Sequence, residues 1–341
     1  MQINKVQNTS NNTNTFKGFL NSKFLTKSLE FASDNGALFV AGTTLVFSSL
    51  IRPLAILATP KAERENKQYA CAKSIASSIT GFALMAIISN PIVQAIKNIS
   101  QKPKKYLSET TIKSLKNGTK ALANSSKFQF VSKIFKLSSG FISAFPKAFL
   151  TCALIPPLMA VFFKQDINLP EKAKESQISF KGRNLNNNLY QEFTKKLSAG
   201  IGKIIDLKPF QNFAQKYHKT NIAQHMFSAN DILLTGLFVK HTKSNKNIKE
   251  SRKKALIYNA SISTIFTIIC GYAVNKMLDK PSQKFVEKFK AANKNSPKLA
   301  KYLDGINVAK PALILSVLYY LITPIVSTML AETATNKAHR G

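Results

Sequence analysis

Long stretches without charge are the feature of this sequence that most constrains its fold. A helix rises about 1.5 Å per residue, so about 20 apolar residues cross the roughly 30 Å of hydrocarbon in a bilayer. Several stretches approach or exceed that length with at most one charged side chain each. They are residues 36–60, 74–96, 140–163, 255–275 and 311–331.

The same stretches argue against a soluble helical protein. A surface helix of a soluble protein carries a polar face along its whole length, and these stretches lack one. We therefore predict an all-α, polytopic helical membrane protein with five spans. The alternative is a soluble helical protein that binds nucleic acid, because the formal net charge is +33. A lysine-rich composition without Trp is typical of an AT-rich genome, so nucleic acid is not the expected partner.

Polar and mostly basic connections separate the spans. The expected segments are a disordered polar tail (1–15), a first helical membrane half (16–165), a basic polar connection (166–219), a second helical membrane half (220–335) and a C-terminal tail (336–341). The first residues lack the apolar region of a secretory signal, so no cleaved signal peptide is expected.

Two basic segments have an apolar face. Residues 16–31 and 127–141 combine this face with lysines, which is typical of helices that lie on anionic membrane surfaces. Packing against the protein's own surface is the alternative for both segments.

The two halves of the chain resemble each other. An offset of 187 residues aligns the second span with the fourth. The matched residues include Glu63 with Glu250, Lys67 with Lys254, Ser74 with Ser261 and Ile75 with Ile262. This favours duplication of a three-helix unit, and chance similarity between apolar segments is the alternative.

A duplication requires a sixth helix. The partner of the first span would be residues 220–239, and Asp231 would then lie at an interface or face another helix. Three spans in each half would turn the second half upside down, as in inverted-repeat transporters.

Five polar or charged residues are candidates for a role inside the membrane: Arg52, Asn90, Lys147, Asp231 and Asn259. Arg52 and Lys147 lie toward the ends of their stretches, so we expect their long side chains to reach the headgroups as anchors. Asn90 and Asn259 would contact a polar pathway if one exists. Small hydroxyl side chains in the spans have a simpler interpretation, which is helix packing.

The sequence contains no pattern typical of a catalytic or metal site. His218 and His225 lie seven residues apart, but no carboxylate or cysteine accompanies them at metal-ligand spacing. The three cysteines are widely spaced in or beside apolar stretches and are interpreted as small buried hydrophobes. We expect no enzymatic activity, no cofactor and no metal.

The function expected from these patterns is a non-enzymatic one in a membrane. Basic segments on every connection would engage anionic lipid headgroups or an acidic protein partner. A small transporter or channel built from inverted three-helix halves is the alternative.

The expected location is the inner membrane of a bacterial cell. Lys and Arg are divided almost equally between the two sides of the spans, so the positive-inside rule gives no orientation.

Overall fold

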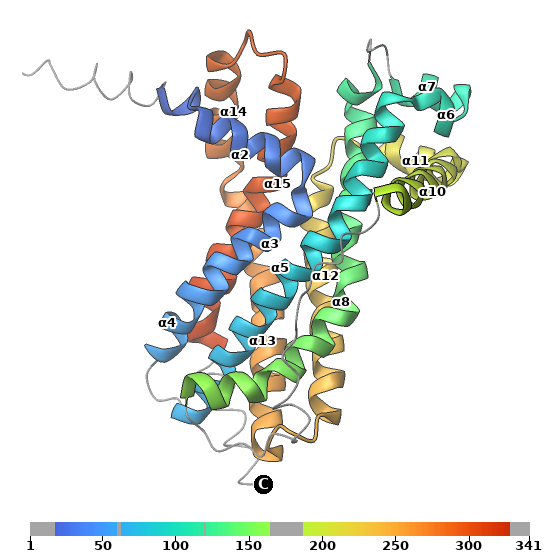
Figure 1. The fold of residues 1–341 in the computed structure, drawn as a ribbon. Coiled ribbons are helices and arrows are strands. Elements are labelled where there is room, and N and C mark those ends of the chain that lie inside the picture. The colour runs from blue at the N-terminus through green and yellow to red at the C-terminus, as the bar shows by residue number, and fades with distance from the viewer. Residues whose placement is uncertain (1–17, 60–62, 117, 119–120, 164–186, 328–341) are drawn as a thin grey trace, which may run out of the picture.

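The computed structural model describes residues 18–59, 63–116, 118, 121–163 and 187–327. These residues form helices joined by short turns and contain no strand. The long helices pack side by side in one elongated bundle, and shorter helices lie across one of its ends (Figure 1). The predicted all-α fold is confirmed for this part of the chain. The predicted tails, 1–15 and 336–341, lie outside the described residues.

Five of the described helices are long and apolar enough to cross a membrane, as predicted. The first combines α3 (Gly36–Val46), the π-helical turn η1 (Phe47–Ile51) and α4 (Arg52–Leu57). The last combines α15 (Leu299–Val317) and the π-helical turn η3 (Leu318–Ile322), and continues to Ser327. The three between them are α5 (Arg64–Gln101), α8 (Ser126–Phe163) and α13 (Glu250–Met277).

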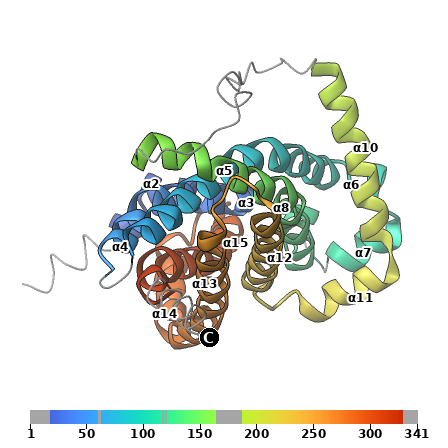
Figure 2. The same ribbon diagram turned by 90° about the horizontal axis from the view of Figure 1, so that it is seen from below.

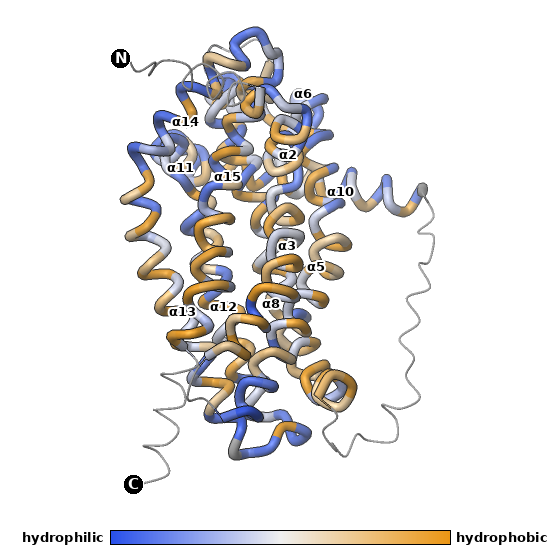
Figure 3. Tube along the Cα trace, turned by 90° about the vertical axis from the view of Figure 1, so that its left-hand side faces the viewer, coloured by the Kyte–Doolittle hydropathy of each residue, from blue (hydrophilic) through white to orange (hydrophobic). Residues whose placement is uncertain are grey.

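Small and hydroxyl-bearing residues face the inside of this bundle. On α13, Ser263 and Thr267 are buried, whereas Ile265 and Ile269 are exposed. Figure 3 shows apolar residues along the length of the long helices. Hydroxyl pairs join neighbouring helices at Ser48–Ser74 (2.7 Å), Ser49–Ser78 (2.9 Å), Thr235–Thr264 (2.7 Å) and Thr267–Thr323 (3.0 Å). In these pairs, the hydroxyl side chains have the predicted role in helix packing.

A sixth long helix, α12 (Ile222–Ser244), packs mainly against α8 and α13. Its 23 residues are enough to cross a bilayer, but it is not among the helices apolar enough to do so. His225 and Asp231 lie within it. The predicted helix at residues 220–239 therefore exists, and its polar content distinguishes it from the five apolar ones.

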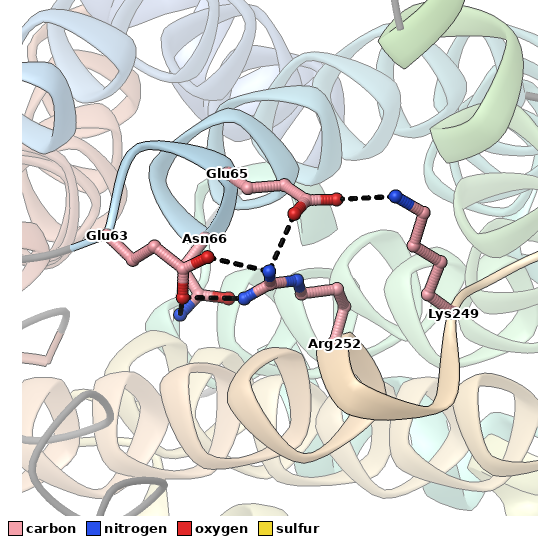
Figure 4. A network of polar contacts seen from close by, with 5 residues as sticks. All are labelled: Glu63, Glu65, Asn66, Lys249 and Arg252. Carbon is pink, nitrogen blue, oxygen red and sulfur yellow. Dashed lines mark hydrogen bonds and ion pairs between the residues drawn. The ribbon is translucent and has the colours of Figure 1, made fainter. Parts of the chain in front are cut away.

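An ion-pair network joins the starts of α5 and α13 (Figure 4). The Arg252 guanidinium donates to Glu63 and to Glu65, both at 2.6 Å, and Lys249 pairs with Glu65 at 3.0 Å. The two helices begin at the same end of the bundle and therefore run parallel. The expectation of inverted halves is wrong, because an inverted repeat places corresponding helix starts at opposite ends. Figure 1 shows the same direction for α3 and α12, and for α8 and α15.

The chain passes from one end of the bundle to the other between α8 and α10 (Asn187–Asp206). Phe163, at the end of α8, packs on Ile56 of α4 and on Ala70, which is near the start of α5. On α10, Ser198 instead accepts a hydrogen bond from Asn98 near the end of α5. The residues between them lie outside the described part and carry eight charged side chains.

The two predicted interfacial segments pack on the protein instead. Phe128, Phe130 and Val131 of α8 are buried in one cluster with residues of α5, α7 (Glu109–Lys116) and α10. The prediction for 127–141 is therefore wrong, because short helices cover this face.

For residues 16–31, the described part includes α2 (Lys23–Asp34), which packs on α14 (Asp279–Ala292) and α15 through Leu29 and Ala32. A Cβ on Gly305 of α15 would fall on the Leu29 carbonyl oxygen, so the two helices cross in close contact. Packing on the protein's own surface, the alternative, applies to Leu29 and Ala32, whereas Phe19 and Phe24 of the predicted apolar face stay exposed.

The parallel halves predict which residues share a side of the membrane. In a cysteine-free background, we expect Lys113→Cys and Lys294→Cys to react with an impermeant maleimide from one face, and Arg64→Cys and Ser244→Cys from the other. Carbonate washing should leave the protein in the membrane pellet. Labelling of the Lys113 and Ser244 sites from the same face would contradict the parallel arrangement.

The network in Figure 4 predicts a pH-dependent contribution to stability. The hydrogen bond from Arg252 lowers the pKa of Glu63 below its ordinary value. The contribution is therefore present above the pKa that Glu63 has in the unfolded chain, and is lost as the pH falls through the lowered pKa. We expect Arg252→Gln to reduce the free energy of unfolding in detergent by about 1–3 kcal/mol at neutral pH, and by less in acid.

The control for this measurement is Lys196→Gln, which removes a fully exposed ion pair with Glu192. It should leave thermal unfolding almost unchanged. An Arg252 variant that unfolds like the native protein at neutral pH would show that the network does not hold the two helices together.

Candidate functional site

A cavity of about 130 Å³ lies in the middle of the bundle, among α3, α5, α8, α12 and α15. Gly81, which lines it, is near the centre of the uncharged stretch between Lys73 and Lys97. On α5 the cavity therefore lies inside the apolar zone, whereas Ala37 and Gly140 line it at the starts of their own uncharged stretches. It has room for several water molecules. Its polar lining consists of Thr44, Ser77, Ser143, Lys147, Asn230, Asp231, Ser316, Tyr319 and Tyr320.

Lys147 projects into the bundle from α8. A Cβ on Gly81 of α5 would come within 2.9 Å of the Lys147 Cε and 3.0 Å of its Nζ, so the glycine makes room for this side chain. The prediction that Lys147 anchors at the headgroups is wrong. Its side chain lies against Gly81 of α5 and lines the cavity, so its ammonium group is directed into the bundle.

Asp231 faces the same cavity from α12. Attraction between Lys147 and Asp231 is present, but their charged atoms are not within the 4.0 Å of an ion pair. Within the described part of the chain, neither side chain has a hydrogen-bond partner. Two opposite charges thus border one small polar space without direct contact.

Asn230, the neighbour of Asp231, adds an unsatisfied acceptor. Its side-chain oxygen is buried and has no hydrogen-bond donor among the described residues. A Cβ on Gly140 of α8 would come within 3.3 Å of the Asn230 amide, so a second glycine makes room for a polar side chain of α12. A buried polar atom without a partner costs about 1–3 kcal/mol, which a polar ligand or a water molecule would recover.

The cavity's polar groups are of kinds that can bind a small solute. An ammonium group, a carboxylate, an amide and several hydroxyls can hold both the negative and the positive end of a small solute. In the described ranges, no group of three or more His, Cys, Asp and Glu side chains is arranged to hold a metal ion.

Arg52 lies beside the cavity and shapes its wall. Only 3 % of its surface is exposed. Its guanidinium donates to the Tyr319 carbonyl oxygen at 2.9 Å and to the Ser263 hydroxyl at 3.3 Å, and lies 4.2 Å from the centre of the Tyr319 ring. The prediction that Arg52 anchors at the headgroups is therefore wrong. It holds η3, whose Tyr319 and Tyr320 line the cavity.

The two candidate asparagines lie elsewhere. Asn90 is exposed on α5 and does not line the cavity. Asn259 is buried on α13 and donates to the Ser327 hydroxyl at 3.3 Å. Of the five candidates, the structure brings only Lys147 and Asp231 together. The sequence analysis did not identify Asn230 as a cavity-lining residue. Its position directly before Asp231 could have indicated it.

Comparison of the chain with protein-family models, with curated proteins and with solved structures finds no match.

The contacts of Arg52 predict a structural role for it. We expect Arg52→Gln to lower the free energy of unfolding by about 2 kcal/mol, because the Tyr319 carbonyl and Ser263 lose a charged hydrogen-bond donor. Thermal unfolding in detergent measures this. Arg64→Gln, which replaces an exposed arginine at the start of α5, is the matched control. Equal unfolding temperatures for the two variants would contradict the role given to Arg52.

Proposed function

We propose that this protein is a multi-pass membrane protein that binds a small polar solute in its central cavity and carries it across the membrane. The observation that carries the proposal is the pair Lys147 and Asp231, two opposite charges that face one cavity inside the bundle without contacting each other. Its location would be a cell membrane, and the bacterial inner membrane is the proposed one.

The distribution of side chains supports a membrane location. Large apolar residues are exposed along the outer faces of the long helices, as at Leu54, Phe145 and Ile269. Hydroxyl groups are enclosed between the helices. In water, such outer faces would attract one another, whereas in lipid they meet a solvent of their own polarity. A soluble nucleic-acid-binding protein has no need of this arrangement.

The cost of the two charges supports solute binding. Ionisable side chains in an apolar layer are expensive, and they normally pair with each other or face a water-filled path. Direct contact between Lys147 and Asp231 would reduce that cost, yet both line the cavity and no ion pair joins them. A solute with a carboxylate and an ammonium or hydroxyl group would bridge the space. We therefore propose a small zwitterion as the first class of solute.

A second hollow supports access from the α2 end. Its volume is about 520 Å³, and Lys97, Lys136 and Lys301 line it together with Asp34 and Asp304. Residues up to Asn35 border this hollow, and Ala37, two residues farther on, borders the central cavity. A charged vestibule so close to the cavity would concentrate polar solutes at its entrance.

The duplication enters this proposal in a corrected form. We propose two parallel units, α3–α5–α8 and α12–α13–α15. At the offset of 187 residues, the start of α5 at Arg64 falls one position after the start of α13 at Glu250. Each unit then contributes one of the cavity's charges, Lys147 from the first and Asp231 from the second.

Uptake into proteoliposomes tests the function. A panel of small amino acids and other zwitterions would be offered to the native protein, with protein-free liposomes as the baseline. We expect uptake of at least one solute, and a loss of about tenfold or more in apparent affinity for Lys147→Met and for Asp231→Asn. Asn90→Ala, on the outer face, should behave like the native protein.

Unchanged permeability across the whole panel would overturn the solute proposal. Uptake that Lys147→Met and Asp231→Asn leave intact would show that the solute follows another path. Both variants would first be compared with the native protein by thermal unfolding, so that loss of folding is not mistaken for loss of binding.

A further inference from the structure

Helix α10 has two different apolar faces. The inner face packs on α5 and α6 (Pro103–Tyr106) through Ile201 and Ile205. A Cβ on Gly202 would fall on the Tyr106 carbonyl oxygen, so α10 is held in close contact with the bundle. The packing of the inner face explains where α10 lies, but it does not explain why the outer face is apolar.

The outer face of α10 carries a stripe of large apolar side chains. Leu189 is 60 % exposed, Phe193 55 %, Ile204 43 % and Leu207 55 %. Leu189, Phe193 and Ile204 are spaced by 4 and 11 residues and therefore share one face of α10, and Leu207 follows in the bend between α10 and α11. Phe213 on the following helix, α11 (Lys208–Tyr217), is exposed as well.

Lysines border this apolar stripe. Lys196 and Lys203 are exposed next to the stripe on α10, Lys195 is exposed on the side of α10 toward Gln94 of α5, and Lys208 and Lys216 are exposed on α11. Of the two acidic residues on α10, Glu192 pairs with Lys196 and Asp206 accepts hydrogen bonds from Ser108. An apolar stripe beside lysines is the composition of helices that lie in the plane of an anionic membrane surface.

The position of α10 matches that surface. Figure 1 and Figure 3 show α10 lying across the bundle axis, and in Figure 2 it extends sideways from the bundle. Its Ser198 is hydrogen-bonded to Asn98 of α5 at 3.3 Å. Asn98 follows Lys97, where the uncharged stretch of α5 ends. Helix α10 is therefore level with the point where α5 would leave the hydrocarbon.

We propose that α10 and the beginning of α11 lie on an anionic lipid leaflet. Leu189, Phe193, Ile204 and Leu207 enter the boundary between headgroups and acyl chains, and the adjacent lysines contact the phosphates. The proposal shares with solute transport only the membrane location of the bundle. It does not depend on the central cavity, so either can fail without the other.

Tryptophan fluorescence tests this directly, because the chain contains no Trp. Phe193→Trp places a single reporter on the apolar stripe, and Gln191→Trp places one on the opposite side of α10. In nanodiscs that contain phosphatidylglycerol with brominated acyl chains, we expect blue-shifted, strongly quenched emission from the first variant. The second lies beside a hollow that Gln94 and Asn98 of α5 line, so the brominated acyl chains should not quench its emission.

Charge is tested with the triple variant Lys195→Gln, Lys196→Gln and Lys203→Gln in the Phe193→Trp background. With the lysines present, quenching should be stronger in phosphatidylglycerol than in phosphatidylcholine nanodiscs. The triple variant should lose that difference. The matched control replaces three exposed lysines of α14, Lys280, Lys284 and Lys290, and should keep it.

Two outcomes would overturn the proposal. One is water-like, unquenched emission from the Phe193→Trp variant in both kinds of nanodisc. The other is emission that is already blue-shifted in detergent and varies with protein concentration, which would show that a second copy of the chain covers the stripe. Carbonate extraction of the same variants separates these outcomes from a failure of membrane insertion.

Discussion

Polar groups inside this bundle have to find their partners inside it, because the outer faces of the long helices are apolar. Ser48 and Ser74, and Thr267 and Thr323, meet across helix contacts in the way this constraint requires. Such pairs replace the hydrogen bonds that water would supply in a soluble protein. Because small hydroxyl residues also let helices approach closely, the same side chains satisfy polarity and set the spacing of the bundle.

The constraint explains why three internal charges differ so much. Arg52 is nearly inaccessible and has a carbonyl oxygen, a hydroxyl and an aromatic ring around its guanidinium, so it is a satisfied part of the scaffold. Lys147 and Asp231 border open space instead and have no comparable partners within the described residues. The contrast distinguishes a charge that holds helices together from the two charges for which we propose a solute.

Several features of the fold could be predicted from residue patterns. Stretches without charge are local, and the length of a helix that crosses hydrocarbon depends only on the rise per residue. The five apolar helices were therefore predictable, and so was the existence of a helix around Asp231. The interfacial interpretation of residues 127–141 failed because an amphipathic pattern does not reveal what covers its apolar face. There, Phe128 and Val131 are covered by short helices of the same protein.

The sequence by itself determined that this chain forms long apolar helices with polar connections, because these properties depend on consecutive residues. Only the tertiary structure decided the direction of the two halves, through the contacts of Arg252 with Glu63 and Glu65. It also decided the different surroundings of Arg52 and Lys147, which looked alike in sequence. The physical reason is that an internal charge is defined by the facing helices, and the identity of those helices is not encoded in any single stretch of the chain.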